Sequence, residues 1–354
     1  MKAVRLGVVG AGSVVTKKHL PALGEVPEIA VVALCRRDAA ALEATADRFR
    51  IPDRYADYRD LVRDPGIDAV LVATGPAAQP AVVQEAVAAG KHVFAEKPMA
   101  GTAAEARALA AAIRGAPVHL QIGFNKRFYY GYRTARQLIR AGELGVPTGI
   151  HARFWFQPGR ADPLLHNGIH FLDLVRFFLG PVEGVLARES APGSAGPAGG
   201  RTWAISLRFA SGAVGNLLIS SLASWDFVNE HVDLVGSNHN TISVENGRLV
   251  RVFRRGAENR SQVAENTLSA HWWSGNDEQG FSLQLRVFAH AVLNGGPAGS
   301  PPDGPGGLAA GSEEGVQALE LLEVVRQSAA TGRSLAVPAA AAGPPARPMS
   351  AAGQ

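Results

Sequence analysis

The sequence contains one cysteine, Cys35, among its 354 residues, and it contains no long uninterrupted apolar run. A single cysteine excludes an internal disulfide, and without a cysteine cluster there is no zinc-ribbon or iron–sulfur framework. A transmembrane helix would need about 20 consecutive apolar residues, so the sequence excludes one. The N-terminal residues show no signal-peptide cleavage pattern, and we therefore expect a soluble, cytoplasmic protein without a membrane partner.

Charge is sparse and nearly balanced. Charged residues make up 19% of the chain and hydrophobic residues 47%, which excludes a disordered chain and provides ample material for a buried core. The formal net charge is +4, and the basic residues are dispersed as isolated pairs rather than gathered in a stripe with aromatic residues. This distribution disfavours a nucleic-acid partner.

The first third of the chain alternates short apolar runs with amphipathic stretches. The apolar runs predict strands at residues 4–9, 29–35, 69–74, 92–95 and 118–123. The stretches between them predict helices at residues 38–49, 80–89 and 102–114. Because strands that alternate with helices form parallel sheets covered on both faces, we predict an α/β fold.

A glycine-containing turn of sequence GAGSVV, residues 10–15, follows the first predicted strand. Gly10 permits a tight turn, and Gly12 lets backbone N–H groups approach a pyrophosphate at the start of the next helix. The third position of this dinucleotide fingerprint is Val15, where Gly or Ala is usual. The alternative is an ordinary strand–helix turn. We predict that four residues of the turn bind a dinucleotide: Gly10, Gly12, Ser13 and Val14.

The end of the second predicted strand favours a particular cofactor. Dinucleotide-binding folds usually place an Asp or Glu here to bind the adenosine ribose, but this chain has Arg36 and Arg37. Guanidinium groups suit a 2′-phosphate, so NADP(H) is favoured while NAD(H) stays possible. In the alternative interpretation, the two arginines lie in a solvated turn before Asp38.

Several motifs resemble the Gfo/Idh/MocA family of NAD(P)-dependent oxidoreductases, which is named for glucose–fructose oxidoreductase and inositol dehydrogenase. The most specific motif is GKHVFAEKP at residues 90–98. The others are VATGP at 72–76, NKRF at 125–128, GIHFLDL at 168–174, ALELL at 318–322 and TGRS at 331–334. The resemblance extends in register from the N-terminus to residue 337.

The resemblance implies a Rossmann dinucleotide-binding domain, with a doubly wound parallel sheet, over residues 1–122. It implies a C-terminal α/β domain for substrate binding and oligomerisation over residues 123–337, with a large open antiparallel sheet. Longer strand-like runs, such as residues 202–208, agree with this division. Residues 338–354 are rich in Ala and Pro, and we expect a disordered tail. Because the family's open sheet often serves as an oligomer interface, we expect a homodimer or homotetramer built through residues 202–254.

The resemblance also places Glu96 and Lys97 under the nicotinamide, with Lys97 reaching the substrate oxygen. Hydride transfer to or from a carbinol needs a general acid or base and a positive or hydrogen-bonding neighbour for the developing alkoxide. A partly desolvated lysine has a lowered pKa, which suits Lys97 to polarise the oxygen or to shuttle a proton. The alternative is a solvated lysine after a strand.

His170 matches the family's catalytic histidine, and His166 stands where the family most often has Asp. Residues four apart share a helix face, so both imidazoles are expected to point into one cleft. Asp173 could hold the His170 ring tautomer or face the exterior, and His166 could instead have a structural role. Asn167 occupies the place of the Glu in an HExxH motif, and we predict no metal site.

The remaining contacts follow from the same resemblance. We predict the catalytic residues Lys97, His170 and His166. Beyond the glycine turn and the two arginines, the expected cofactor contacts are Thr74, Gly75, Gln79, Glu96, Lys97 and Asn125. The expected substrate contacts are Arg153, Trp155 and His166. Arg153 and Trp155 lie on the first strand of the second domain, and in the alternative interpretation that strand packs alternately into core and solvent.

Together these features predict an oxidoreductase that transfers a hydride between a nicotinamide and a carbinol or ketone of a sugar, cyclitol or sugar nucleotide. Two alternatives with the same fold stay open. One is a cofactor-retaining lyase or hydrolase. The other is a non-catalytic regulatory protein that senses a dinucleotide.

Overall fold

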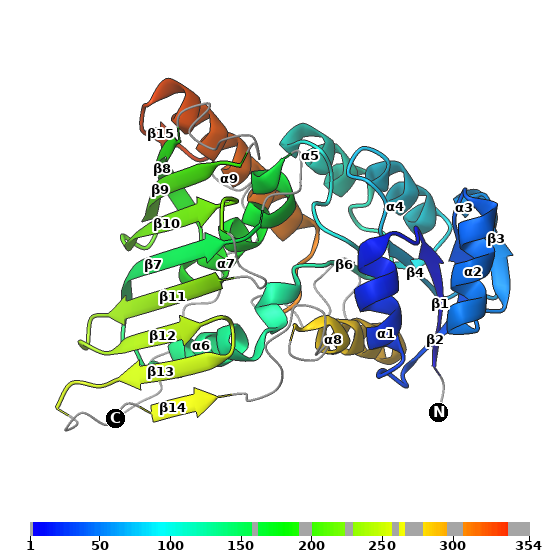
Figure 1. Cartoon of the computed structure of the whole chain (residues 1–354), viewed down its shortest axis with the longest axis horizontal. Helices are drawn as coiled ribbons and strands as arrows, with labels where there is room; N and C mark the ends of the chain where they lie inside the picture. The colour runs from blue at the N-terminus through cyan, green and yellow to red at the C-terminus, as the bar shows by residue number, and fades with distance from the viewer. Residues whose placement is uncertain are drawn as a thin grey trace.

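The computed structural model describes residues 3–157, 162–190, 200–223, 229–256, 262–265, 279–295 and 307–338. These residues form two sheets that lie side by side, with the N-terminal sheet on the right of Figure 1 and the second sheet on the left. None of the described helices is both long and apolar enough to cross a membrane. The predicted tail lies outside the described residues, apart from Pro338.

The N-terminal sheet has six parallel strands in the order β3-β2-β1-β4-β5-β6, which is the order of a doubly wound dinucleotide-binding fold. The strands are β1 (Val4–Val9), β2 (Ile29–Cys35), β3 (Asp53–Tyr55), β4 (Ala69–Val72), β5 (His92–Ala95) and β6 (Leu120–Ile122). The helical segments between them are η1 (Val15–His19), α1 (Leu20–Leu23), α2 (Ala39–Phe49), α3 (Tyr58–Arg63), α4 (Gln79–Ala88) and α5 (Ala103–Ala112). The predicted α/β fold with a parallel Rossmann sheet is confirmed.

Local capping fixes where two of these helices begin. The Asp38 carboxylate accepts a hydrogen bond of 3.0 Å from the Ala41 N–H at the start of α2. At the start of α5, the Thr102 hydroxyl accepts from the Glu105 N–H, and the Glu105 carboxylate accepts from the Thr102 N–H. Such caps satisfy N–H groups that have no partner within the helix.

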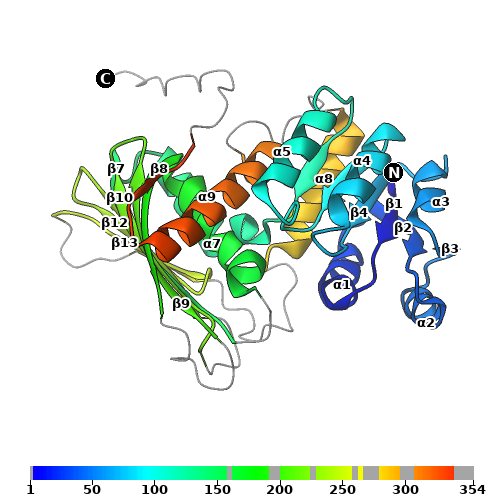
Figure 2. The ribbon, with the colours of Figure 1, turned by 90° about the horizontal axis from the view of Figure 1, so that it is seen from above.

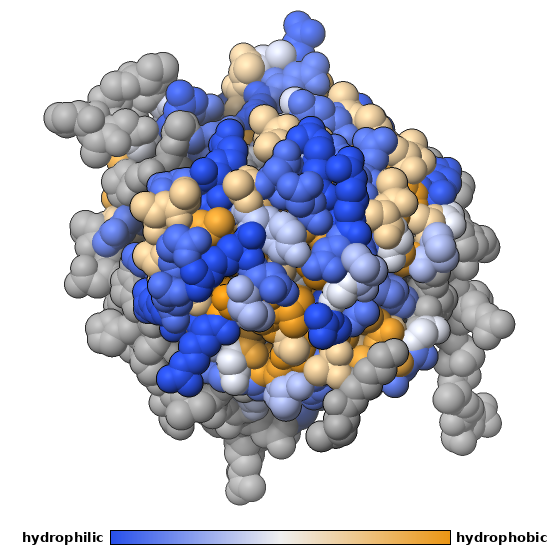
Figure 3. All heavy atoms as spheres, turned by 90° about the vertical axis from the view of Figure 1, so that its right-hand side faces the viewer, coloured by the Kyte–Doolittle hydropathy of each residue, from blue (hydrophilic) through white to orange (hydrophobic). Residues whose placement is uncertain are grey.

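The outer end of this domain presents mainly hydrophilic residues, with apolar ones gathered in a smaller area (Figure 3).

The second sheet is mixed and mostly antiparallel, in the order β14-β13-β12-β11-β7-β10-β9-β8-β15. Its strands are β7 (Pro147–Trp155), β8 (Val182–Glu189), β9 (Thr202–Phe209), β10 (Val214–Ser220), β11 (Asn229–Gly236), β12 (Thr241–Glu245), β13 (Leu249–Phe253), β14 (Gln262–Glu265) and β15 (Leu335–Ala336). Among the described pairs, only β7 and β10 run parallel. The predicted large, mainly antiparallel sheet is therefore confirmed.

Helices cover one face of this second sheet, the face that looks toward the Rossmann domain (Figure 2). They are α6 (Tyr130–Arg140), the segment η3 (Leu164–Gly168) with its continuation α7 (Ile169–Leu179), and α9 (Ser312–Thr331). Phe154 of β7 stacks on Phe171 of α7, with ring centroids 4.6 Å apart. Within the described part of the chain, no helix covers the opposite face of the sheet.

One helix from the C-terminal half returns to the Rossmann domain. This is α8 (Phe281–Asn294), which lies beneath the Rossmann sheet in Figure 1. Its side chains Phe281, Leu285 and Phe288 are buried in the same apolar cluster as β1 and β5. Phe288 also meets Phe94 edge to face, at 5.9 Å between ring centroids. The expected second domain, residues 123–337, is thus interrupted by a helix that packs on the first domain.

A buried ion pair fixes the segment that leaves the Rossmann domain. This segment is the 3₁₀ turn η2 (Asn125–Phe128), and its Arg127 side chain forms two hydrogen bonds with the Asp173 carboxylate of α7, at 2.7 and 2.5 Å. Both side chains are almost fully buried. Removing one partner of such a pair typically costs about 3–5 kcal/mol of stability. Both expectations for Asp173 were wrong, because its carboxylate neither faces the exterior nor holds His170.

Candidate active site

The carboxyl ends of β1, β4 and β5 meet at one edge of the Rossmann sheet, where open α/β sheets bind their ligands. Gly10 follows β1 with a φ of +95°, and a Cβ atom there would lie 2.5 Å from the Ala73 carbonyl oxygen. Only glycine fits that position. At Gly12 and Gly75, by contrast, nothing described lies within 4 Å of a Cβ position. The turn therefore opens toward space that a bound dinucleotide can occupy.

Other features of this edge also fit a dinucleotide. Ser13 and Val14 are exposed at the turn. The Thr74 hydroxyl, just after β4, is buried and has no hydrogen-bond partner among the described residues. A buried polar group without a partner is costly, so a ligand that supplied one would be stabilised.

The two arginines after β2 occupy different environments. The Arg36 guanidinium donates a hydrogen bond of 2.7 Å to the Ala11 carbonyl oxygen and lies 3.8 Å from the Asp38 carboxylate. Arg37 is exposed. Arg36 is therefore held over the glycine turn, rather than extended into solvent as a simple solvated turn would leave it.

Glu96 is anchored inside the protein. Its Oε1 lies 2.7 Å from His19 Nε2, and its Oε2 accepts a 3.0 Å hydrogen bond from the Lys97 N–H. Burial alone would raise the pKa of Glu96, but the hydrogen bond from His19 and the charges of His19 and Lys97 hold that pKa below its usual value. Sequence reasoning missed His19, because no local pattern links it to a residue 77 positions away.

Gln79 supports the same segment from the other side. Its amide nitrogen donates to the carbonyl oxygens of Glu96 and Pro98, the latter at 2.8 Å. The side chain is 1% exposed, so both donor hydrogens are used within the protein. The structure thus shows Gln79 holding the backbone around Lys97, rather than presenting its amide to a cofactor.

Lys97 connects the two domains. Its Nζ donates a 2.6 Å hydrogen bond to the backbone carbonyl oxygen of His166 in η3. The segment η3 has the wider turns of a π-helix, a rare feature that is frequent at functional sites. The expectation that His166 works through its imidazole missed this contact, since the atom that holds Lys97 is a main-chain oxygen that any residue could supply.

His170 lies one turn further along, in α7, and is only 8% exposed. Burial is the largest cause that lowers its pKa well below 6.5, and the charges of Lys97 and Lys126 lower it further. The imidazole is therefore neutral at neutral pH. Its Nδ1 is buried without a hydrogen-bond partner among the described residues, and the ring meets Phe124 edge to face. Lys97 and His170 therefore lie close enough for the charge of the one to lower the pKa of the other, and their catalytic roles stay a prediction.

Lys126 is a second cation near His170 that sequence reasoning did not single out. Its ammonium group is buried in an ion pair with Glu230 of β11 and lies 4.7 Å from the centre of the Phe154 ring. Burial lowers the pKa of Lys126, and Glu230 opposes that effect. Its position within the NKRF segment was visible in the sequence, but its partner, 104 residues away, was not.

Asn125 and Lys18 both bind Gln279, at the start of α8. The Asn125 amide donates to the Gln279 carbonyl oxygen at 3.0 Å, and Lys18 Nζ donates to the Gln279 side chain at 2.7 Å. Burial lowers the pKa of Lys18 to about 8. The Asn125 side chain, expected to contact the cofactor, therefore ties the turn η2 to the returning helix.

Arg153 and Trp155 lie away from this site. Along β7, Phe154 faces the helices, so the neighbouring side chains of Arg153 and Trp155 face the opposite, open side of the sheet. The Arg153 guanidinium lies over the Trp155 ring at 5.2 Å. The structure does not bring these two residues to Lys97 and His170, and we leave them out of the site as a correction.

Among the described residues, no group of three or more His, Cys, Asp or Glu side chains is placed to hold a metal ion.

Comparison with known proteins agrees with this arrangement. Residues 4–124 match the NAD-binding Rossmann domain of the Gfo/Idh/MocA oxidoreductase family, and residues 132–250 match the family's C-terminal domain. The oxidoreductase YrbE of Bacillus subtilis is 30% identical over 264 residues, which are 71% of this chain and 76% of YrbE. Inositol 2-dehydrogenase of Salmonella typhimurium is 34% identical over 155 residues, 43% of this chain and less than half (46%) of that protein.

Among solved structures, levoglucosan dehydrogenase in complex with NADH and L-sorbose has the same fold, with a TM-score of 0.80. The match covers 96% of this chain and 100% of the other, at 20% sequence identity. The family matches include residues of both sheets. Lys97 follows the Rossmann strand β5, and its amine contacts the segment η3 that leads to His170 in the second domain. The chain therefore belongs to the Gfo/Idh/MocA family of oxidoreductases.

Proposed function

We propose that this oxidoreductase transfers a hydride between a nicotinamide cofactor and a carbinol or ketone of a sugar or cyclitol. The observation that carries the proposal is the hydrogen bond of the Lys97 amine, at the edge of the Rossmann sheet, to the His166 carbonyl oxygen, one helical turn before the buried imidazole of His170. The names of similar proteins, inositol 2-dehydrogenase and levoglucosan dehydrogenase, support the substrate class.

Lys97 supplies positive charge to the substrate oxygen. Its hydrogen bond to the His166 carbonyl oxygen fixes the amine at the junction of the two domains. A fixed cation of this kind stabilises the alkoxide that develops as a carbinol is oxidised. Because Gln79 and Glu96 hold the backbone on either side, this arrangement needs little reorganisation during the reaction.

His170 moves the proton. Its depressed pKa keeps the imidazole unprotonated, so it accepts the hydroxyl proton when a carbinol is oxidised. In the reverse direction the protonated ring returns that proton to the ketone oxygen. The cofactor, when bound, accepts or supplies the hydride. His166 contributes its carbonyl oxygen to the site, and its imidazole, on the same helical segment, is a candidate contact for the substrate.

The cofactor lies, in this proposal, along the open glycine turn. Gly10 makes the tight turn, and its own N–H donates to the Cys35 carbonyl oxygen at 3.0 Å. Gly12, Ser13 and Val14 present backbone N–H groups to a pyrophosphate, and Thr74 and Gly75 line the neighbouring strand end. Arg36 and Arg37 stand where the adenosine ribose is bound in such folds, and guanidinium groups favour a 2′-phosphate. We therefore propose NADP(H) in preference to NAD(H).

The catalytic roles predict that Lys97→Met lowers turnover by about 10²–10⁴-fold, the usual loss when an acid/base or oxyanion-stabilising group is removed. His170→Asn should lose a similar factor. The double variant should be little worse than either, because the two side chains act as a unit. The assay is consumption of NADPH or NADH across a panel of keto-sugars and inososes.

Arg107→Met is the matched control, since it also removes a cation, from an exposed ion pair with Glu320. It should leave turnover unchanged. Near-normal turnover in Lys97→Met would contradict the assignment. If the unaltered protein bound the cofactor but turned over no substrate of the panel, the regulatory alternative would be favoured instead.

The cofactor proposal predicts that NADPH binds more tightly than NADH. Replacing both Arg36 and Arg37 with Ala should remove about 1–3 kcal/mol of that preference, because charge-assisted hydrogen bonds to the 2′-phosphate are lost. Arg54→Ala is the control, since Arg54 lies on the adjacent strand β3 and is engaged with Glu43 and Asp47. Calorimetric titration with each cofactor measures the dissociation constants of the unaltered protein and of both variants, and equal affinities in the unaltered protein would reject the preference.

The open face of the second sheet supports a proposed homodimer or homotetramer. Its strands expose large apolar side chains, among them Val214, Val235 and Phe253, which are 59%, 42% and 47% exposed. A second copy of the chain would bury such a face. Light scattering at micromolar concentration should give the mass of two or four chains, and Val214→Arg should lower it. The mass of a single chain would count against this assembly.

A further inference from the structure

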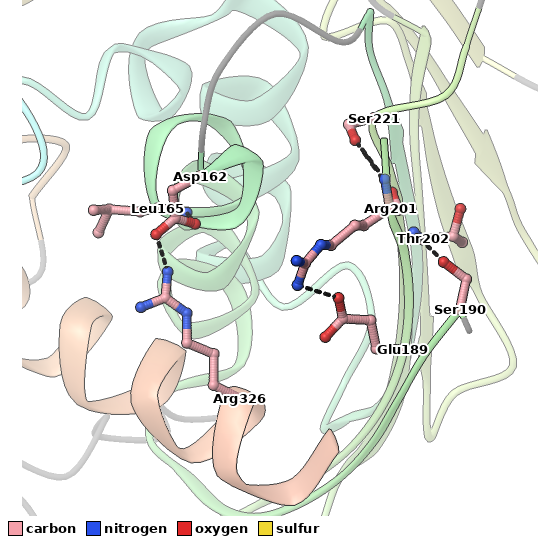
Figure 4. A network of polar contacts seen from close by, with 8 residues as sticks. All are labelled: Asp162, Leu165, Glu189, Ser190, Arg201, Thr202, Ser221 and Arg326. Carbon is pink, nitrogen blue, oxygen red and sulfur yellow. Dashed lines mark hydrogen bonds and ion pairs between the residues drawn. The ribbon is translucent and has the colours of Figure 1, made fainter. Parts of the chain in front are cut away.

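A cavity of about 370 Å³ lies in the second domain, between the sheet and its covering helices. Two half-exposed ion pairs border it. Arg201 of β9 pairs with Glu189 of β8 at 2.7 Å, and Arg326 of α9 pairs with Asp162, just before η3. Figure 4 shows that the Arg201 side chain extends from the sheet toward the helices that carry the other pair.

The remaining lining is apolar. Pro163 and Leu164 contribute from the start of the helical segment, and Trp203 contributes from β9, two residues after Arg201. The cavity thus has an apolar part and two separate sites where a cation and an anion lie side by side. Neither Lys97 nor His170 borders it.

These two ion pairs contribute little to the stability of the folded protein. Exposed pairs contribute about 0–1 kcal/mol, and the side chains of Arg201 and Arg326 are 60% and 41% exposed. Their convergence on a cavity therefore points to a ligand rather than to stability. The four charges of the described lining sum to zero, so these residues give no net attraction to an ion.

We propose that this cavity binds a neutral polyhydroxylated ring, of the sugar or cyclitol class. A guanidinium group only donates hydrogen bonds and a carboxylate only accepts them, whereas a hydroxyl group does both. Each ion pair therefore matches a pair of neighbouring hydroxyls, with bonds that are charge-assisted. Leu164 and Trp203 are almost fully buried, so the ring is held mainly by the two ion pairs.

The cavity lies one helical turn from the proposed active site. The Asp162 carboxylate accepts a hydrogen bond from the Leu165 N–H at 3.1 Å, and its carbonyl accepts one from the His166 N–H at 3.0 Å. His166 in turn holds Lys97. The ring is accordingly either the second unit of a longer substrate or a separate sugar molecule. This binding goes beyond the proposed hydride transfer and does not depend on it.

Calorimetric titration with glucose, myo-inositol, maltose and lactose tests the proposal, with citrate and inorganic phosphate as anionic probes. At least one neutral probe should bind, and it should quench tryptophan fluorescence in the unaltered protein but not in Trp203→Phe. Arg201→Ala should weaken this binding by about tenfold or more, the scale for losing a charge-assisted hydrogen bond.

Arg208→Ala is the matched control. Arg208 lies on the same strand β9 and pairs with Glu183 of β8 at 2.9 Å, but it does not border the cavity. It should leave the affinity unchanged. The proposal is overturned if no neutral probe binds, if an anion binds more tightly than every neutral probe, or if Arg208→Ala weakens binding as much as Arg201→Ala.

The same titrations in Lys97→Met distinguish the two sources of the ring. A disaccharide that spans both sites should lose affinity in Lys97→Met as well as in Arg201→Ala. A separate ring should lose affinity only in Arg201→Ala. Because binding is read without turnover, a failure of the proposed hydride transfer would leave the outcome for the cavity unaffected.

Discussion

One hydrogen bond, from Lys97 Nζ to the carbonyl oxygen of His166, joins the two domains where the proposed chemistry takes place. Lys97 follows β5 at the edge of the Rossmann sheet, and His166 lies in η3 of the second domain. Because η3 continues into α7, the same bond holds Lys97 one helical turn before His170. Around this bond, the Gln79 amide holds the backbone carbonyl groups of Glu96 and Pro98, which flank Lys97. The buried Arg127–Asp173 ion pair fixes α7 against the turn η2 that leaves the Rossmann domain.

Three cations lie around the site. Lys126 is buried beside Glu230, and Arg127 is buried against Asp173. Lys97 donates to the His166 carbonyl oxygen, and its charge lowers the pKa of both Glu96 and His170. In a buried setting such charges interact more strongly than in water. The site thus combines a fixed positive charge with an imidazole whose pKa is held low.

Local patterns in the sequence predicted five of the six Rossmann strands, with β1, β2 and β5 matched residue for residue, because their apolar runs are bounded by glycine or charge. The short strand β3 was not predicted. The glycine turn and the positions of Lys97 and His170 were also predictable. Long-range contacts were not: the His19–Glu96 bond, the returning helix α8 and the carbonyl that holds Lys97 each join residues far apart in the chain. No sequence pattern distinguished the two faces of β7, and Arg153 was therefore placed on the wrong one.

The pKa of His170 is the measurement that tests this account most directly. An NMR titration of the histidine ring signals, with His170 assigned from their difference to His170→Asn, gives its value in the folded protein. We predict a pKa well below 6.5, which rises in Lys97→Met because a nearby positive charge is removed, and which stays unchanged in Arg107→Met. A pKa at or above 6.5 in the unaltered protein, or one that Lys97→Met leaves unchanged, would contradict the coupling of these two side chains.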